Sequence, residues 1–188
     1  MIKEPKVIEV KTSAHIIVAE YPVDPNLLSN VDDINYENSY STNVKAKMSG
    51  WYLQSPEIRK WQDWVTEIAM GGYSLGIMDT HRLSFSNTWI NRYDVGDHAV
   101  DHRHLPNLVS VVYFIKTPEG SSPLIFTESG EEIEAKEGTA VIFPSHLYHH
   151  VPPNECEDRI TMAGNLEVLD ENHPRYFFER SIRNIGAL

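Results

Sequence analysis

Cysteine, basic residues and long hydrophobic runs are all scarce in this sequence, and each scarcity excludes a class of protein. Cys156 is the single cysteine, so the chain can form no internal disulfide and carries no Cys-x-x-Cys metal site. The 16 Lys and Arg residues stand against 27 Asp and Glu residues, and the net charge of −11 argues against a protein that grips a nucleic-acid backbone. No apolar run reaches the length of a signal peptide or a membrane span, so we expect a cytoplasmic protein, in a host or cell cytosol.

The composition is that of an ordinary globular domain. Hydrophobic residues make up 41% of the chain and charged residues 23%, which is enough apolar material for a core and leaves no sign of disorder. The sequence contains no internal repeat, no low-complexity segment and no linker. We therefore predict one domain over residues 1–188.

The clearest helix signal begins at Ser55. Ser55 is a favourable N-cap and Pro56 suits the first helical position. Gly71 and Gly72 mark the expected end. The residues that fall on one face at helical spacing, and that we expect to pack as core, are Ile58, Trp61, Val65 and Ile68.

Most of the remaining chain is typical of short strands separated by turns. Segment 24–50 reads instead as a loop with a short helix near Leu27–Val31, and a further helix is expected at Arg175–Arg180. The pattern predicts a mainly β fold, a double-stranded β-helix (a cupin-like jelly roll) with one or two flanking helices. The expected strands are Val7–Val10, His15–Val18, Arg82–Tyr93, Ala99–His104, Leu108–Ile115, Leu124–Phe126, Glu131–Ala135, Thr139–Phe143, Tyr148–Val151 and Arg159–Val168.

Three histidines are candidate metal ligands. His102 and His104 are two positions apart, and on a strand side chains at i and i+2 point to the same face. His149 follows another expected strand and a turn, so three neutral imidazoles could meet at one ion with positions left open. The metal affinity should then fall as the pH drops through roughly 6.5, the unperturbed histidine value. The alternative is that these are surface histidines, since nine in the chain leave some close pairs to chance.

Arg159 can begin the strand that follows His149 and its Pro-Pro-Asn turn. On a regular strand Arg159, Thr161, Ala163 and Asn165 share one face, which places a guanidinium and a hydroxyl toward the histidines. A guanidinium holds a carboxylate bidentately, so an acidic ligand beside the metal is expected. The alternative is a surface arginine paired with a nearby carboxylate, those available being Glu155, Glu157 and Asp158.

The order of short motifs resembles the 2-oxoglutarate and Fe(II)-dependent oxygenases of bacteria and phages, within the jelly-roll oxygenase superfamily. The resemblance covers most of the chain. In that superfamily the first motif is usually His-x-Asp or His-x-Glu; here His104 stands in the carboxylate position, and Val111 stands where glycine is more usual. The motifs lie at Thr42-Asn43, Ser49 to Trp51, Trp89 to Asn91, His102 to His104, Ser110 to Ile115, Gly138 to Ser145, His149 to Asn154, Arg159 to Thr161 and Asn165.

The resemblance implies a hydroxylase that converts 2-oxoglutarate and O2 to succinate and CO2. His102, His104 and His149 would hold Fe(II), and Arg159 would hold the distal carboxylate of 2-oxoglutarate. The prime substrate, a small molecule or a peptide, stays open; a homodimer would be unsurprising, and segment 24–50 could form a lid. The residues expected to help bind the cosubstrate are Tyr113, Thr161, Asn91 and Asn165.

Two other functions fit parts of the pattern. Gly96 with His102 and His104, and Gly138 with His149, also resemble the two motifs of cupins, which include three-histidine dioxygenases and isomerases. A cupin glutamate is missing after His104, however. A metal-free jelly-roll binding protein is the third hypothesis. Metal content separates the third from the others, and dependence on 2-oxoglutarate separates the first two.

Overall fold

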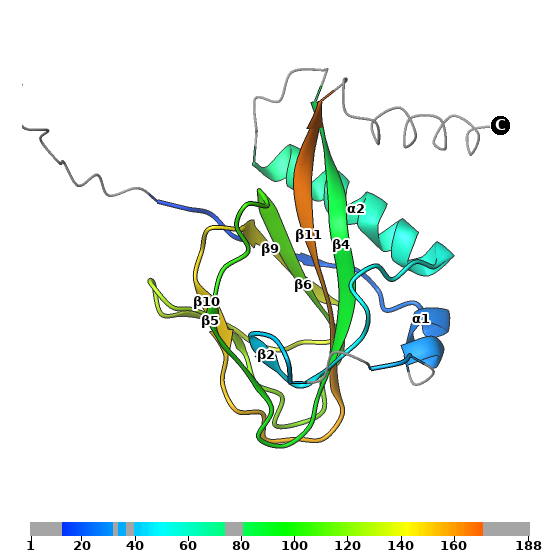
Figure 1. Ribbon diagram of the computed structural model, residues 1–188, viewed down its shortest axis with the longest axis vertical. Helices are drawn as coiled ribbons and strands as arrows, with labels where there is room; N and C mark the ends of the chain where they lie inside the picture. Colours follow the sequence, from blue (N-terminus) through cyan, green and yellow to red (C-terminus); the bar gives the residue numbers. More distant parts are fainter. Residues whose placement is uncertain (1–12, 32–33, 37–39, 74–80, 171–188) are drawn as a thin grey trace, which may run out of the picture.

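The computed structural model describes residues 13–31, 34–36, 40–73 and 81–170, and these form two facing antiparallel sheets (Figure 1). Within these ranges no helix is both long and apolar enough to cross a membrane. The major sheet has the order β1-β9-β6-β11-β4-β3, and the minor sheet β2-β5-β10-β7-β8. The strands are β1 (Ile17–Glu20), β2 (Val44–Lys45), β3 (Lys47–Met48), β4 (His81–Tyr93), β5 (His98–His102), β6 (Val109–Lys116), β7 (Leu124–Phe126), β8 (Glu131–Ile133), β9 (Thr139–Pro144), β10 (His149–Val151) and β11 (Arg159–Asp170).

The path of the chain between the sheets makes this a jelly roll. From β4 to β7 and again from β8 to β11, each strand lies in the sheet opposite to the one before it. Every pair of neighbouring strands is antiparallel, with β4 and β11 the longest pair. The predicted fold class is therefore confirmed, and the space between the sheets is available for a site.

Two layers of side chains cover the two faces of the major sheet. On one face Ile160 and Met162 of β11 lie in a cluster with the helices α1 (Pro25–Asn30) and α2 (Pro56–Gly72). On the other face Ala163 of β11 and Phe114 of β6 pack between the sheets. Figure 1 shows α2 running across the outer face of β4 and β11. Residues of β11 with odd numbers from 159 to 165 therefore face the interior, as the predicted alternation requires.

Helix α2 forms much as its sequence predicts. The Ser55 hydroxyl accepts the Ile58 N–H at 3.2 Å, and Pro56 occupies the first turn. Ala69 completes the fully buried stripe, whereas Ile68 is only partly buried, because a period of 3.6 residues favours position 69 after Val65. The helix ends at the two glycines as predicted, with Gly72 its last residue and Tyr73 its C-cap.

The other expected elements agree with the structure within a few residues, with one difference that affects the site. The short helix predicted near residues 27–31 is α1. The strand expected to reach His104 ends instead at His102, because the His104 N–H donates to the Ser145 carbonyl and the chain turns toward Asn107. The expected strand at Val7–Val10 and helix at Arg175–Arg180 lie outside the described residues.

Replacing Trp61 by alanine should lower the free energy of unfolding by about 3–5 kcal/mol. Trp61 is 1% exposed and its ring lies 5.4 Å from that of Phe85 and 5.7 Å from that of Tyr113, so truncation leaves a cavity between α2 and the sheet. Denaturant unfolding measures the loss. Lys60→Ala, on the exposed face of the same helix, should change stability by no more than about 0.5 kcal/mol. An equally small effect at Trp61 would contradict the packing described here.

Candidate metal centre

Three imidazoles meet between the sheets. His102 ends β5 and His149 begins β10, and the two residues are directly opposite each other in the β5–β10 pair. His104 comes from the turn after β5. The ring centroids are 4.4 Å apart for His102 and His149, 4.8 Å for His102 and His104, and 5.1 Å for His104 and His149. One potential ligand atom from each residue lies within 4.8 Å of the other two, so the group could hold a single metal ion.

Backbone hydrogen bonds fix the tautomers of two of these rings. Nδ1 of His102 lies 2.7 Å from the Val100 carbonyl, and Nδ1 of His149 lies 3.0 Å from the Leu147 carbonyl. A carbonyl oxygen can only accept, so each Nδ1 carries the proton. Nε2 of both rings then keeps its lone pair for a metal, an arrangement usual for ligating histidines.

Burial keeps the three histidines neutral. Burial is the main cause that lowers the pKa of His149 to about 4 and that of His104 to about 3, and the neighbouring imidazoles contribute to both shifts. Burial also lowers the pKa of His102 from its ordinary value. Because a protonated imidazole cannot bind a metal, these environments favour ligation at neutral pH.

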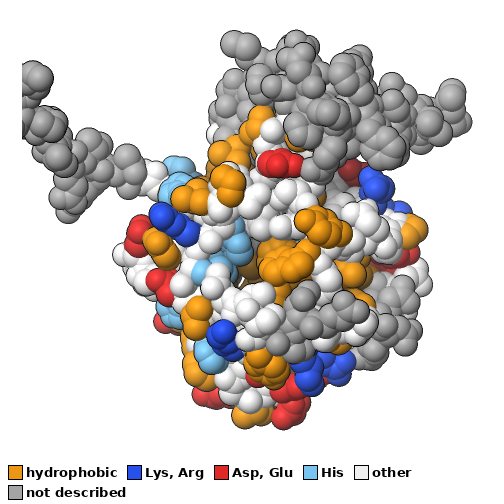
Figure 2. Space-filling view, viewed as in Figure 1, with side chains coloured by type: hydrophobic (Ala, Val, Ile, Leu, Met, Phe, Trp, Pro, Cys, Tyr) orange, Lys and Arg blue, Asp and Glu red, His pale blue; other side chains and the backbone are white. Residues whose placement is uncertain are grey.

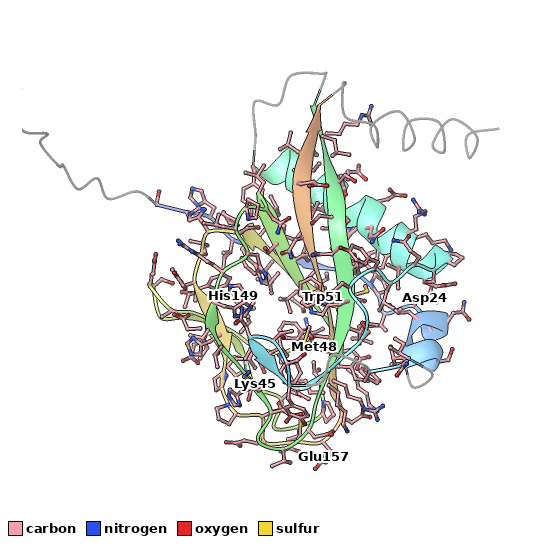
Figure 3. All side chains as sticks on the ribbon, in the orientation of Figure 1. Asp24, Lys45, Met48, Trp51, His149 and Glu157 are labelled. Atoms are coloured by element: carbon pink, nitrogen blue, oxygen red, sulfur yellow. The ribbon has the colours of Figure 1, made fainter. Side chains whose placement is uncertain are left out.

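Aromatic side chains surround the histidines. Phe143 stands edge-on to His149 with ring centroids 4.8 Å apart, and Trp89 lies 6.0 Å from His104. Figure 2 shows histidine and hydrophobic side chains around a hollow, and Figure 3 places His149 and Trp51 on its two sides. Such walls limit water near the metal position.

No carboxylate joins the three histidines within the described ranges. Asp101, which precedes His102, is exposed and accepts a hydrogen bond from Thr127 Oγ1 at 2.5 Å. It therefore points away from the imidazoles, as expected for its place on the strand. The donor set is three neutral nitrogens, which suits iron, zinc, copper or nickel.

Arg159 lies in the same interior and is an unpaired buried cation. It is 1% exposed, and its Nε, Nη1 and Nη2 atoms have no hydrogen-bond partner among the described residues. Its Cζ lies 4.6 Å from the ring centroid of Tyr93 and 5.4 Å from that of Phe114. Burial lowers the pKa of the guanidinium and the Tyr93 hydroxyl opposes this, but an arginine keeps its proton. A buried charge without a counter-ion is unfavourable, so the arrangement fits an anionic ligand.

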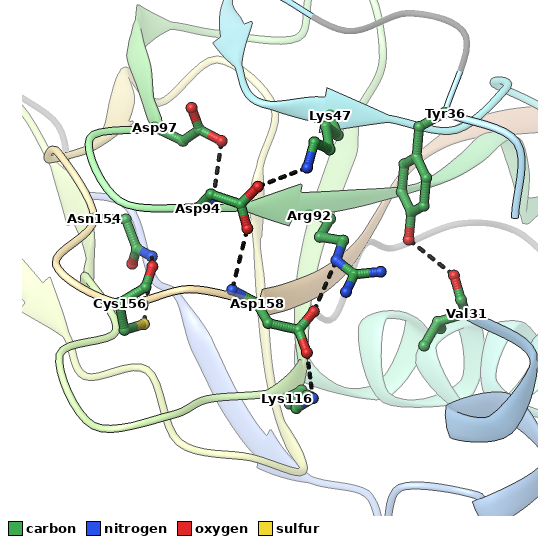
Figure 4. Close-up of polar contacts among 10 residues, drawn as sticks. All are labelled: Val31, Tyr36, Lys47, Arg92, Asp94, Asp97, Lys116, Asn154, Cys156 and Asp158. Atoms are coloured by element: carbon green, nitrogen blue, oxygen red, sulfur yellow. Dashed lines mark hydrogen bonds and ion pairs between the residues drawn. The ribbon is translucent and has the colours of Figure 1, made fainter. Parts of the chain in front are cut away.

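Asp158 does not pair with Arg159. The alternative of a surface arginine paired with this carboxylate is therefore wrong. The Asp158 carboxylate contacts Nε of Arg92 at 2.8 Å and Nζ of Lys116 (Figure 4). The Asp158 N–H donates to Asp94 Oδ1 at 3.3 Å, and the residue has a φ of 65°, a conformation that few side chains adopt. These contacts fix the start of β11 and leave the next side chain, Arg159, directed inward.

Comparisons with known proteins identify the fold. No protein-family model and no curated protein sequence matches the chain. Among solved structures it is similar to the viral collagen prolyl hydroxylase of Paramecium bursaria Chlorella virus-1 in complex with 2-oxoglutarate, with 15% identity over 80% of this chain and 94% of that chain, and a TM-score of 0.63. The chain has the fold of the 2-oxoglutarate/Fe(II) oxygenases.

Two further structures share this oxygenase fold. An oxidoreductase of the 2-oxoglutarate/Fe(II) oxygenase family from Burkholderia pseudomallei is 12% identical over 81% of this chain and 85% of its own, with a TM-score of 0.59. A prolyl hydroxylase from Trichoplax adhaerens, bound to a peptide fragment of the hypoxia inducible factor oxygen degradation domain, is 12% identical over 81% and 83%, with a TM-score of 0.51. Identities this low show the fold alone.

Thr161 and Asn91 lie beside Arg159 in the oxygenase fold, but Asn165 is already engaged. Asn91 Nδ2 donates to Thr161 Oγ1 at 3.4 Å, and both residues are buried. Asn165 donates through Nδ2 to Asn87 and accepts at Oδ1 from Ser110, at 3.0 and 2.8 Å. Its amide therefore links β11 to β4 and β6.

The structure does not bring Tyr113 into this group. Its ring packs against Trp61 on the helix side of the major sheet, and its hydroxyl donates to the Tyr21 carbonyl at 3.0 Å. Phe114, the next residue, is the one that faces the interior. We therefore leave Tyr113 out of the site.

Sequence reasoning missed the aromatic residues of the interior. Tyr93 and Phe114 enclose Arg159, and Trp89 lies beside His104. Trp89, Asn91 and Tyr93 alternate along β4, so extending the i and i+2 rule from Asn91 in both directions would have found two of the three.

The described part of segment 24–50, the predicted lid, is attached to both sheets, with β3 paired to β4 of the major sheet and β2 to β5 of the minor sheet. Val44 of β2 pairs with Ala99 of β5, and the Tyr40 hydroxyl donates to Asp97 at 2.9 Å. This segment therefore lies beside the strand that carries His102. A closing movement stays a prediction.

Proposed function

We propose that this protein is a 2-oxoglutarate- and Fe(II)-dependent dioxygenase that hydroxylates a substrate with release of succinate and CO2. The observation that supports it most is the pairing of a three-histidine cluster with an unpaired, buried arginine inside one jelly roll. Three imidazoles leave metal positions for a chelating 2-oxo acid and for O2, and the arginine fits its second carboxylate.

The residues have distinct roles in this proposal. His102, His104 and His149 bind Fe(II), which supplies the oxidative chemistry when it and 2-oxoglutarate are bound. Arg159 binds the distal carboxylate, and Thr161 with Asn91 lies beside it. The hydrogen bonds of two Nδ1 atoms hold the ligating rings in place, and the aromatic walls exclude water from the reacting centre.

The prime substrate is proposed only as a class, a peptide or a small molecule. The Trichoplax neighbour holds a peptide, which supports the first of these. The net charge of −11 disfavours nucleic acid. Action in the cytosol and assembly as a homodimer stay predictions.

A three-histidine cupin enzyme is the second candidate, because no carboxylate joins the imidazoles in the described part of the chain. Arg159, which has no partner among the described residues, favours the dioxygenase that uses 2-oxoglutarate. A cupin whose substrate carries no second carboxylate would leave this guanidinium without an anionic partner. A metal-free binding protein would leave the cluster of three neutral imidazoles without a role.

Purified protein with Fe(II), a reductant and O2 should slowly convert 2-oxoglutarate to succinate even without its prime substrate. Binding can be measured without turnover, by titrating 2-oxoglutarate into the anaerobic Fe(II) protein and following metal-to-ligand charge-transfer absorption. Protection against heat unfolding should accompany binding. The same protein stripped of metal is the control. If 2-oxoglutarate produced no charge-transfer absorption and gave no protection against unfolding, the cupin candidate would be favoured.

A further inference from the structure

Trp89 carries a buried hydrogen-bond donor that nothing in the described protein satisfies. The residue is 3% exposed and lies on the interior face of β4, opposite Ala163 of β11. Its Nε1 has no hydrogen-bond partner among the described residues. Ala163 offers no polar side-chain atom, and the Trp51 ring covers Trp89 at a centroid distance of 4.9 Å. A buried N–H without a partner is unfavourable, so this indole N–H is a candidate to donate a hydrogen bond to a bound ligand.

The position of the Trp89 N–H relative to the Arg159 guanidinium indicates which part of a ligand each would bind. Within the described residues, the fully buried N–H groups between the sheets that lack a partner belong to Trp89 and Arg159. Trp89 lies beside His104, whereas the guanidinium lies over Tyr93, which is four residues further along β4, a rise of about 13 Å between the two α-carbons. One donor is thus at the proposed metal and the other at the far end of the same wall.

We propose that the Trp89 indole N–H binds the carboxylate at the oxo end of 2-oxoglutarate, a role that rests on the proposed function. A 2-oxo acid that chelates a metal uses one oxygen of that carboxylate and leaves the second as an acceptor. The side chains that contact His104 and His149 include the aromatic rings of Trp89 and Phe143, so this oxygen needs a specific donor. Trp89 is the residue beside His104 whose side-chain donor has no partner among the described residues. Trp89 therefore recognises the feature that all 2-oxo acids share, and Arg159 the feature that selects a dicarboxylate.

Two ligands and two variants separate these roles. The anaerobic Fe(II) protein is titrated with 2-oxoglutarate and with pyruvate, which has the oxo end but no distal carboxylate, and charge-transfer absorption reports binding. Trp89→Phe keeps the aromatic ring and removes the N–H, and should weaken both ligands by the same factor, about tenfold. Arg159→Leu should weaken 2-oxoglutarate and leave pyruvate unchanged.

Trp61→Phe is the matched control, because it removes another buried, unpartnered indole N–H, on the helix side of the major sheet. It should leave both affinities at the wild-type value. Fe(II) affinity, measured separately, should be the same in wild type and Trp89→Phe, which a general structural defect would not allow. Unchanged affinities in Trp89→Phe, or a loss for 2-oxoglutarate alone, would overturn the assignment. A wild-type protein that binds neither oxo acid would overturn the proposed function itself.

Discussion

Replacing Arg159 by leucine should weaken 2-oxoglutarate binding by roughly 1.5–3 kcal/mol, about tenfold to a hundredfold. The guanidinium is fully buried and none of its three nitrogens has a hydrogen-bond partner among the described residues, so these donors are available to the ligand. Arg159→Lys should also weaken binding, because a point charge cannot reproduce the planar fork. Titration of the anaerobic Fe(II) protein measures both changes.

Stability separates loss of an anchor from loss of the fold. An unpaired buried cation destabilises the folded protein, whereas leucine between Tyr93 and Phe114 would add apolar contact. The metal-free Arg159→Leu protein should therefore unfold at a temperature no lower than wild type. Arg103→Leu is the control: Arg103 is exposed, over the Tyr148 ring at 4.9 Å. Binding that survives in Arg159→Leu and falls in Arg103→Leu would move the anchor to Arg103.

The strands were predictable from local pattern because alternation and turn residues are properties of neighbouring positions. Arg159 to Asn165 shows this: polar and small side chains alternate with Ile160 and Met162, and the two sets face opposite layers. The same reasoning failed for Tyr113, since β6 is hydrophobic on both faces and its sequence does not say which face meets the helices.

The meeting of the three histidines was predictable from the sequence, but the charge environment of Arg159 was not. His102 and His149 lie where the strand pattern puts them, while His104 reaches the cluster through a turn held by Ser145. That Arg159 is unpaired depends on Arg92 and Lys116, two cations from other strands that bind Asp158. No spacing along the chain reveals a contact of this kind, because it forms only when β4, β6 and β11 lie side by side.

The pH dependence of metal binding should differ from the simple expectation of a loss near pH 6.5. Because burial lowers the pKa of His149 to about 4 and that of His104 to about 3, protons compete with the metal only at those lower values. In the metal-free protein the unfolded histidines bind protons below about 6.5, and the folded ones do not. The free energy of unfolding should therefore fall as the pH drops from 6.5 toward 4.

Replacing His149 by alanine tests the ligand and this linkage together. Removing a hydrogen-bond partner that orients a metal-binding residue typically lowers metal affinity by about ten- to a hundredfold. Removing the metal-binding imidazole itself should therefore lower Fe(II) affinity by about a hundredfold or more. His150→Ala is the control, because that neighbour bonds to Thr127 at 3.0 Å on the outer face. The pKa shift of His149 corresponds to roughly 3 kcal/mol, so metal-free His149→Ala should lose less stability between pH 6.5 and 4 than wild type. Wild-type iron affinity in His149→Ala would show that the ion binds elsewhere, and an unaltered pH dependence would show that His149 is not a buried neutral imidazole.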